Sequence, residues 1–190
     1  NSAVIARDMA LKEDPQKKIA LLDSCSTGPE LVLCVRELER LIQSGADFDS
    51  IVLSAKDYLA KARVLFALCS FHNLVKNGRM NKMAGFVARA LNMWGIGSGS
   101  DEGRIVIEGK TRGAGRALEL LLSKMEEKGF SGSRAAISHC ANLPLAEKLK
   151  DRILDRWPHA EVTLLPTRGL CSYYAERGGL ILSFETPRKS

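Results

Sequence analysis

The sequence lacks the features that mark membrane, secreted and metal-binding proteins. None of its apolar runs approaches the ~18 residues that a membrane helix needs, which excludes an integral membrane protein. The five cysteines are odd in number, widely spaced and without a CxxC pair, and the three histidines are scattered, so neither a disulfide framework nor a metal site is supported. Because no signal peptide or lipidation motif is recognised, we expect a cytoplasmic protein without a metal or other cofactor.

Aromatic residues are also scarce, at 6% of the chain, and neither sign of charge dominates. The 28 Lys and Arg against 22 Asp and Glu leave a net charge of +6, and the basic residues are scattered along the chain. A nucleic-acid-binding protein more typically gathers its basic residues on one face and adds stacking aromatics. We therefore expect no nucleic-acid partner. The excess charge fits either a solvated basic surface or an anionic ligand or acidic partner.

What is present is the pattern of an α/β protein. With 190 residues, of which 45% are hydrophobic, the chain is long enough to bury a real core. Strand-like apolar runs alternate with segments of helical periodicity, which favours an α/β fold. The predicted helices are residues 1–12, 30–44, 48–61, 72–77, 81–93, the stretch from Gly115 through Glu127, and 144–156. The predicted strands are residues 18–22, 63–70, 104–108, 133–139, 161–165 and 180–184. The predicted loops and turns include residues 96–103, 109–115 and 170–179.

A change of character falls near Gly78-Arg79. Before it, residues 63–70 form a continuous apolar run of the kind found in buried parallel sheets. After it, the strand-like segments alternate in part between apolar and polar residues. We therefore predict two α/β domains, residues 1–78 with a mainly parallel sheet and residues 79–190 with a mixed sheet.

Gly109-Lys110-Thr111 looks like the end of a phosphate-binding P-loop but lacks its spacing. The motif needs four residues between its two glycines. Five residues separate Gly103 from Gly109, and they are strand-like. Lys110 and Arg112 still place two cations beside a predicted helix N-terminus, which favours anions. An exposed basic turn is the alternative explanation.

Polar residues also follow other predicted strands. His139 and Cys140 are adjacent at a strand end, where neighbours point to opposite faces, so they do not form a catalytic pair. His139 either lines a cleft or is simply hydrogen-bonded there. Ser24 follows another predicted strand and either binds an anion or carboxylate or belongs to a helix cap. Tyr173 and Tyr174 either place one ring in the core and one hydroxyl in a cleft, or belong to a plain loop.

In their order and spacing, these segments resemble the motifs of the DegV family of bacterial fatty-acid-binding proteins over essentially the whole chain. The matching segments are Asn1-Ser2-Ala3 (the end of S-G-[ST]-Y-x-S-A), Asp23-Ser24 (the DS element), Leu74–Met80 (L-x-x-G-G-R-[IM]), Gly103–Ile105 with Lys110–Gly113 (G-x-I…K-x-R-G), and Tyr174–Phe184 (H-x-G-P-G-x-x-G-[ILV]-x-[FY]). Tyr174 stands in place of the family's histidine, and Glu176-Arg177 stand where Gly-Pro is usual. The resemblance implies that on the order of two or three βα units of the family precede Asn1.

The resemblance implies two α/β domains, the first incomplete here, with an acyl chain in a cleft between them. It implies a binding subunit without enzymatic activity, which presents a long-chain fatty acid to a separate kinase that makes acyl phosphate for phospholipid synthesis. The ligand-binding residues we assign are Ser2, Ser24, His139 and Tyr174. The residues we assign to the kinase or to the transferred phosphate are Arg79, Lys110 and Arg112.

Two other interpretations stay open. An enzyme acting on a small phosphorylated or carboxylated metabolite would use Lys110, Arg112 and His139 in a polar cleft. A purely structural α/β domain of a larger assembly would bind no ligand, and it would expose a broad apolar patch where a further segment packs.

Overall fold

The structure is a computed structural model that describes residues 2–80, 92–100 and 102–187. It contains two compact units, one of residues 1–24 and 34–60 and the other of residues 25–33 and 61–190. Helix α2 (Pro29–Gln43) begins in the second unit and continues into the first. The predicted domain boundary after residue 78 remains a proposal.

The first unit is helical. It holds α1 (Ser2–Glu13), most of α2 and most of α3 (Phe48–Lys61), which confirms the three helices predicted from periodicity. Asp47 caps α3, because its carboxylate accepts hydrogen bonds from the backbone N–H and the hydroxyl of Ser50. These hydrogen bonds lower the pKa of the Asp47 carboxyl below its usual value.

The strand predicted at residues 18–22 is wrong. These residues have no regular secondary structure, and none of the described segments pairs with them. A short apolar run becomes a strand only when a neighbouring strand takes up its backbone hydrogen bonds, and the run itself carries no information about that neighbour.

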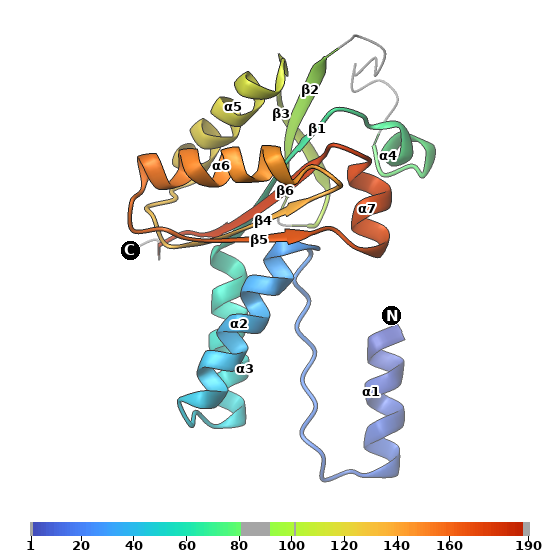
Figure 1. Cartoon of the computed structure of the whole chain (residues 1–190). Coiled ribbons are helices and arrows are strands. Elements are labelled where there is room, and N and C mark those ends of the chain that lie inside the picture. The colour runs from blue at the N-terminus through green and yellow to red at the C-terminus, as the bar shows by residue number, and fades with distance from the viewer. Residues whose placement is uncertain (1, 81–91, 101, 188–190) are drawn as a thin grey trace. The chain divides into compact units, whose positions relative to one another are not determined.

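The second unit is built on one mixed sheet of six strands in the order β3-β2-β1-β6-β4-β5 (Figure 1). The strands are β1 (Ala62–Leu68), β2 (Met93–Gly99), β3 (Ile105–Arg112), β4 (Arg134–His139), β5 (Glu161–Pro166) and β6 (Leu180–Glu185). The helices are α4 (His72–Lys76), α5 (Ala114–Glu127), α6 (Leu143–Arg156) and α7 (Gly169–Ala175). The predicted α/β class is therefore confirmed.

The pairing of β1 corrects the sheet expected for residues 1–78. The apolar run at residues 63–70 forms a strand as predicted, but β1 pairs antiparallel with both β2 and β6. The only parallel pair among the described strands is β4 with β5. A continuous apolar run shows that both faces of a strand are covered, and a central antiparallel strand meets that condition as well as a parallel one does.

Side chains on the two faces of the sheet form two separate apolar clusters. On one face, α5 and α6 pack over β1, β4 and β6, with Leu65, Ile137 and Leu182 fully buried. On the other face, α4 and α7 contribute to a second cluster, which we call the α4/α7 cluster. Its buried members are Phe66, Leu68, Phe71, Leu74, Ala175 and Ile181.

Two predicted loops are in part regular elements. Residues 96–103 were expected as a Gly/Ser loop, yet β2 continues to Gly99. Gly97 lies in this strand at a position where a Cβ would overlap Cζ of Phe66. The neighbouring ring therefore fills the space of the missing side chain, a relation that no local pattern reveals. The second expected loop, residues 170–179, largely forms α7.

The polar turn predicted at residues 109–115 is shorter than expected. Strand β3 runs to Arg112 and contains a bulge opposite Ile96 and Gly97 of β2. The bulge turns Glu108 toward α5, where its carboxylate lies 2.7 Å from Nζ of Lys128 and accepts a hydrogen bond from Ser98. Of the helix predicted at residues 81–93, residues 81–91 lie outside the described part of the chain.

Gly97→Ala is expected to lower the free energy of unfolding by about 1–3 kcal/mol, because the new methyl group overlaps the Phe66 ring and the Val106 carbonyl. Urea denaturation measures the change. Gly115→Ala is the matched control, since nothing lies within 4 Å of the added Cβ in the first turn of α5. The control is expected to leave stability unchanged or to raise it by up to about 1 kcal/mol. Equal effects of the two substitutions would contradict the packing of Phe66 over β2.

Candidate functional site

Four strands of the second unit end at one side of the sheet. β1 and β4 each pair antiparallel with β6, β5 pairs parallel with β4, and β3 and β1 each pair antiparallel with β2, so β1, β3, β4 and β5 run in the same direction. Helices α4, α6 and α7 follow β1, β4 and β5, and α4 and α7 lie side by side there (Figure 1). Ligands of open α/β sheets collect at the carboxyl ends of strands. This edge, with the adjoining face of the sheet, is the candidate site.

The strand register places a strip of apolar residues on the face of the α4/α7 cluster. Directly opposed residues of paired antiparallel strands share a face. One row across the strands is Phe66, Gly97 and Ile107, and the next row toward the carboxyl end of β1 is Leu68, Gly95 and Lys110. We call Val64, Phe66, Leu68, Ile105 and Ile107 the apolar strip. Between its β1 and β3 residues lie the glycines of β2, which add no side chain to this face. Lys110 therefore stands at one end of the apolar strip.

The two adjacent tyrosines lie on α7 and differ in their surroundings. Tyr174 is half-buried and packs against the α4/α7 cluster, whereas Tyr173 is 41% exposed. Their rings meet edge to face with centroids 5.2 Å apart. The hydroxyl of Tyr173 accepts a hydrogen bond from Nδ2 of Asn77 at 2.9 Å. Helix α7 follows the carboxyl end of β5, and Lys110 lies near the carboxyl end of β3, which runs in the same direction, so Tyr174 and Lys110 are at the same end of the sheet. The role of Tyr174 toward a ligand stays a prediction.

His139 ends β4 on the opposite face of the sheet. It pairs with Leu180, which belongs to the cluster under α5 and α6. Its Nδ1 accepts a hydrogen bond from the backbone N–H of Asn142 at 3.3 Å, which places the proton of a neutral ring on Nε2. The carbonyl of His139 accepts from the backbone N–H of Thr167 at 2.9 Å. These bonds hold the histidine at the head of α6, away from the face of the apolar strip.

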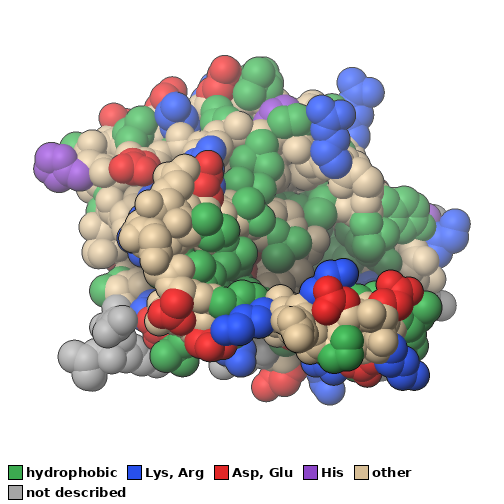
Figure 2. Space-filling view, turned by 90° about the horizontal axis from the view of Figure 1, so that it is seen from below, with side chains coloured by type: hydrophobic (Ala, Val, Ile, Leu, Met, Phe, Trp, Pro, Cys, Tyr) green, Lys and Arg blue, Asp and Glu red, His purple; other side chains and the backbone are tan. Residues whose placement is uncertain are grey.

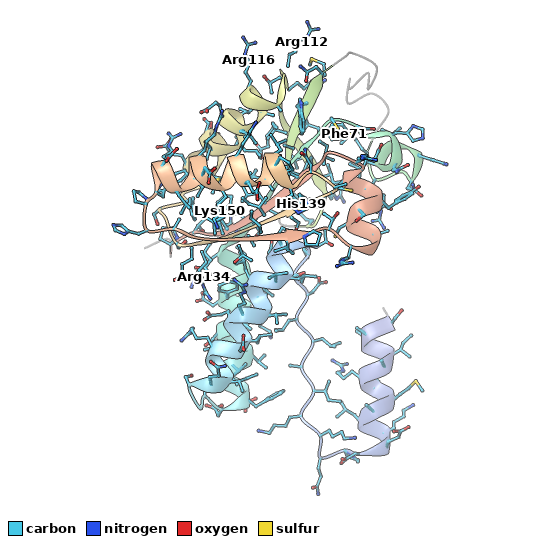
Figure 3. All side chains as sticks on the ribbon, in the orientation of Figure 1. Phe71, Arg112, Arg116, Arg134, His139 and Lys150 are labelled. Atoms are coloured by element: carbon cyan, nitrogen blue, oxygen red, sulfur yellow. The ribbon has the colours of Figure 1, made fainter. Side chains whose placement is uncertain are left out.

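The structure does not bring His139 together with Lys110 and Arg112. Strands β2, β1 and β6 lie between β3 and β4, so at ~4.8 Å per strand these residues are ~19 Å apart across the sheet. Figure 3 shows Arg112 beside Arg116 at the start of α5, well apart from His139. Arg79, which follows α4, is exposed, and its backbone N–H donates to the carbonyl of Leu74.

Ser2 and Ser24 both belong to the first unit. Ser2 is exposed at the start of α1, and Ser24 is half-buried in the segment that precedes α2. Their assignment as ligand-binding residues stays a prediction.

The polar segment before α2, for which the sequence offered a helix cap as one interpretation, forms a cluster at the start of that helix. The hydroxyl of Ser26 donates to the Glu30 carboxylate at 2.8 Å, and Oγ1 of Thr27 lies 3.2 Å from Sγ of Cys171 on α7. Glu30 is only 4% exposed. Burial raises the pKa of its carboxyl, and the bond from Ser26 and the charge of Arg63 act in the opposite direction. The run Thr27-Gly28-Pro29-Glu30 has the spacing of a capping box, but the hydroxyl that bonds Glu30 is that of Ser26, one residue earlier.

Other classes of site have no support in the described residues. Within residues 2–80, 92–100 and 102–187, no group of three or more His, Cys, Asp or Glu is placed to hold a metal ion. None of the helices in that part of the chain is long and apolar enough to cross a membrane. On the face that Figure 2 presents, basic and acidic side chains are interspersed rather than gathered by sign.

The fold and this edge define an open mixed-sheet α/β protein. A family model described as "Uncharacterised protein, DegV family" matches residues 1–186, and the chain belongs to that family. A DegV domain-containing protein of Streptococcus pyogenes serotype M1 is 38% identical over 185 residues, which are 97% of this chain and 66% of the relative. The chain therefore spans just under two thirds of the length of such curated relatives.

Two solved structures are similar to the whole chain. A DegV family protein from Eubacterium eligens, loaded with heptadecanoic acid, has a TM-score of 0.95 and 38% identity, with 98% of this chain and 68% of that one covered. The Fatty Acid Kinase (Fak) B3 protein of Streptococcus pneumoniae, loaded with linoleic acid, has a TM-score of 0.94 and 36% identity, with 98% and 66% covered.

Glu30→Gln is expected to raise stability near pH 8 and to have little effect near pH 4. The raised pKa means that the folded state binds a proton more readily than the unfolded state, so ionisation of Glu30 costs stability above the raised pKa. Below the usual pKa both states are protonated and the cost disappears. Glutamine removes the charge but still accepts the bond from Ser26.

Urea denaturation at about pH 4 and pH 8 measures this difference. Glu147→Gln, on the exposed side of α6, is the control and is expected to change neither value. A Glu30→Gln variant that is less stable than the wild type at pH 8 would contradict the prediction.

Proposed function

We propose that this protein binds a long-chain fatty acid and presents its carboxylate to a separate kinase subunit. The kinase would transfer a phosphoryl group from ATP to the carboxylate and form an acyl phosphate for phospholipid synthesis. The protein itself would carry out no chemistry and need no cofactor. A cytoplasmic location and the absence of nucleic-acid partners belong to the same proposal.

The observation that carries the proposal is the apolar strip with a basic residue at one end. Val64, Ile105 and Ile107 are only partly buried, although they continue the apolar surface of Phe66 and Leu68. Two short helices, α4 and α7, contribute to this cluster, and a Cβ at Gly28, just before α2, would lie 4.0 Å from Cδ1 of Ile181, whereas two long helices cover the other face. A fatty acid has the same division into a long apolar tail and a single anionic head.

The energetics of such a ligand are reasonable. Burying about 14 methylene groups at about 0.8 kcal/mol each gives roughly 11 kcal/mol before the costs of association are subtracted. The carboxylate must meet hydrogen-bond donors, because an unpaired buried charge is very costly. Lys110, assigned from the sequence to the kinase or the transferred phosphate, stands at the end of the apolar strip, so we propose it instead as a carboxylate donor, together with the Tyr174 hydroxyl, within the second unit. Ser2 and Ser24 are the further donors we propose.

The two similar structures support the same ligand class. Both are described as loaded with fatty acids, one saturated and one unsaturated, and one of them is a Fatty Acid Kinase B protein. Arg79 and Arg112 are exposed, which suits the role we propose for them against the kinase or the transferred phosphate. His139 faces the other side of the sheet, so a ligand-binding role for it has the least support.

The geometry favours the carrier function over an enzyme that acts on a small phosphorylated or carboxylated metabolite. That interpretation joins His139 to Lys110 and Arg112, which lie on different faces and are ~19 Å apart across the sheet. General acid–base catalysis needs the groups within hydrogen-bond reach of one substrate.

Native mass spectrometry of the protein purified from a bacterial host, followed by organic extraction, tests the proposal. We expect a C16 to C18 fatty acid at a ratio of about one per chain, because an acyl tail of that length buries enough surface to survive purification. Should the protein be empty and also fail to take up added palmitate or oleate, the carrier function is wrong for this chain.

Tyr174→Phe and Lys110→Ala are expected to weaken palmitate binding by about fivefold and about tenfold or more, because each removes a donor to the carboxylate. Binding of hexadecanol, which has the same tail without a charge, is expected to change less. Lys148→Ala on α6 is the matched control for loss of a lysine. Titration of delipidated protein measures the affinities, and an equal loss for acid and alcohol would contradict the assignment of the head group.

Arg112→Ala is expected to bind palmitate as the wild type does but to yield less acyl phosphate when a fatty acid kinase and ATP are added. The titration measures the binding, and the amount of acyl phosphate formed measures the transfer. Unchanged acyl phosphate formation would show that Arg112 serves neither the kinase nor the phosphate.

A further inference from the structure

Glu176 has a backbone conformation that suits glycine. Its φ of 54° and ψ of 168° lie in a region that side-chain-bearing residues rarely adopt, at a cost of about 1–3 kcal/mol. The family motif usually has Gly-Pro where this chain has Glu176-Arg177. A glycine would adopt this conformation without strain. Contacts of the surrounding structure must therefore offset the strain.

The side chain of Glu176 makes one such contact with α4. Its Oε1 accepts a hydrogen bond from the backbone N–H of Asn73 at 3.0 Å, in the first turn of the helix. Phe71, the residue that precedes α4, offers no side-chain hydrogen bond to this turn. The hydroxyl of Ser70 accepts a hydrogen bond from the backbone N–H of His72 at 3.3 Å, so the carboxylate from a distant part of the chain adds a second side-chain cap to this turn.

Two further hydrogen bonds join α4 to α7. Nδ2 of Asn73 donates to the carbonyl of Tyr173 at 2.8 Å, and Nδ2 of Asn77 donates to the hydroxyl of Tyr173 at 2.9 Å. We call Asn73, Asn77, Tyr173 and Glu176 the α4–α7 latch. Beneath it lie Phe71, Leu74 and Ala175 of the α4/α7 cluster.

The turn that carries Glu176 is held by hydrogen bonds to two cysteines, Cys69 and Cys140. Sγ of Cys69 lies 3.5 Å from the carbonyl of Arg177, to which the thiol donates. Burial first, and then the charge of Glu176, raise the pKa of the Cys69 thiol, so it stays a neutral donor. The backbone N–H of Gly178 donates to the carbonyl of Cys140 at 2.8 Å. The turn that positions the Glu176 carboxylate against α4 is therefore hydrogen-bonded to the residues that directly follow β1 and β4.

We propose that Glu176 is a positioning residue that holds α4 against α7 beside the Leu68 end of the apolar strip and slows the release of the fatty acid. The inference deepens the function proposed above and rests on it. Tyr174 directly follows a member of the latch, and Arg79 follows α4, with its backbone N–H bonded to Leu74. The latch therefore fixes the proposed head-group residue and the proposed kinase-facing residue with respect to each other.

Three substitutions separate the carboxylate contact from the backbone strain. Glu176→Gln keeps an oxygen that accepts from Asn73. Glu176→Gly removes this acceptor and also relieves the strain, whereas Glu176→Ala removes the acceptor and keeps the strain. We expect Glu176→Ala to unfold about 3–6 °C below Glu176→Gly, which isolates the strain.

The first readout needs no ligand. Hydrogen exchange of the α4 amides, followed by mass spectrometry on this chain, is expected to be faster in Glu176→Gly and Glu176→Ala and close to wild type in Glu176→Gln. Unchanged exchange in all three variants would overturn the latch whether or not the protein binds fatty acids.

The second readout is the release of a fluorescent palmitate analogue to albumin. We expect release to be about 5- to 30-fold faster in the glycine and alanine variants, and near the wild-type rate in Glu176→Gln. Faster α4 exchange without faster release would overturn the role in ligand retention. If the wild type takes up no fatty acid, the proposed function fails, and the exchange experiment alone decides whether the latch exists.

Discussion

The second unit depends on the antiparallel pairing of β1 with β6. These strands come from far-apart parts of the chain, and together they occupy the centre of the sheet, with β2 and β3 on one side and β4 and β5 on the other. Leu65 of β1 and Phe184 of β6 have no exposed surface. Because both strands have a neighbour on each side and side chains packed on each face, their backbone groups and apolar side chains leave water together. The direction of β6 also sets that of β1 and β4, and so decides which strand ends meet at the candidate site.

The two faces of this sheet differ in how completely they are covered. The long amphipathic helices α5 and α6 close one face with side chains such as Leu121 and Leu149, which are fully buried, and this packing supplies stability. On the other face, residues such as Ile105 and Ile107 stay partly exposed, and the covering elements α4 and α7 are short. A surface that binds an apolar ligand must keep some apolar area uncovered in the free protein. The division between closed and open faces is therefore the physical basis of the proposed carrier function.

Prediction from sequence succeeded where one periodicity extended over a whole element. The helices at 30–44, 48–61 and 144–156 and the strands at 133–139 and 180–184 were all recognisable in this way. Prediction failed where the structure of a segment depends on a neighbour that is distant in the sequence. Gly97 suggested a loop, but it lies in a strand, where the ring of Phe66 leaves no room for a side chain. Residues 18–22 suggested a strand, but no described segment pairs with them. Most candidate site residues were named from motifs. The face of the sheet on which each lies and the distances between them could not be predicted, because no local pattern gives the order of the strands.

The amino-acid sequence by itself determined the α/β class, the positions of most elements and membership of the DegV family, because periodicity, turn residues and motif spacing are local properties of the chain. Only the tertiary structure decided that β1 runs antiparallel to both neighbours, that His139 lies on the other face from Lys110, and that Glu176 bonds to α4. These facts depend on which distant segments pack together. That choice is made by the summed burial of side chains and pairing of backbone groups across the whole sheet, and no short segment contains it.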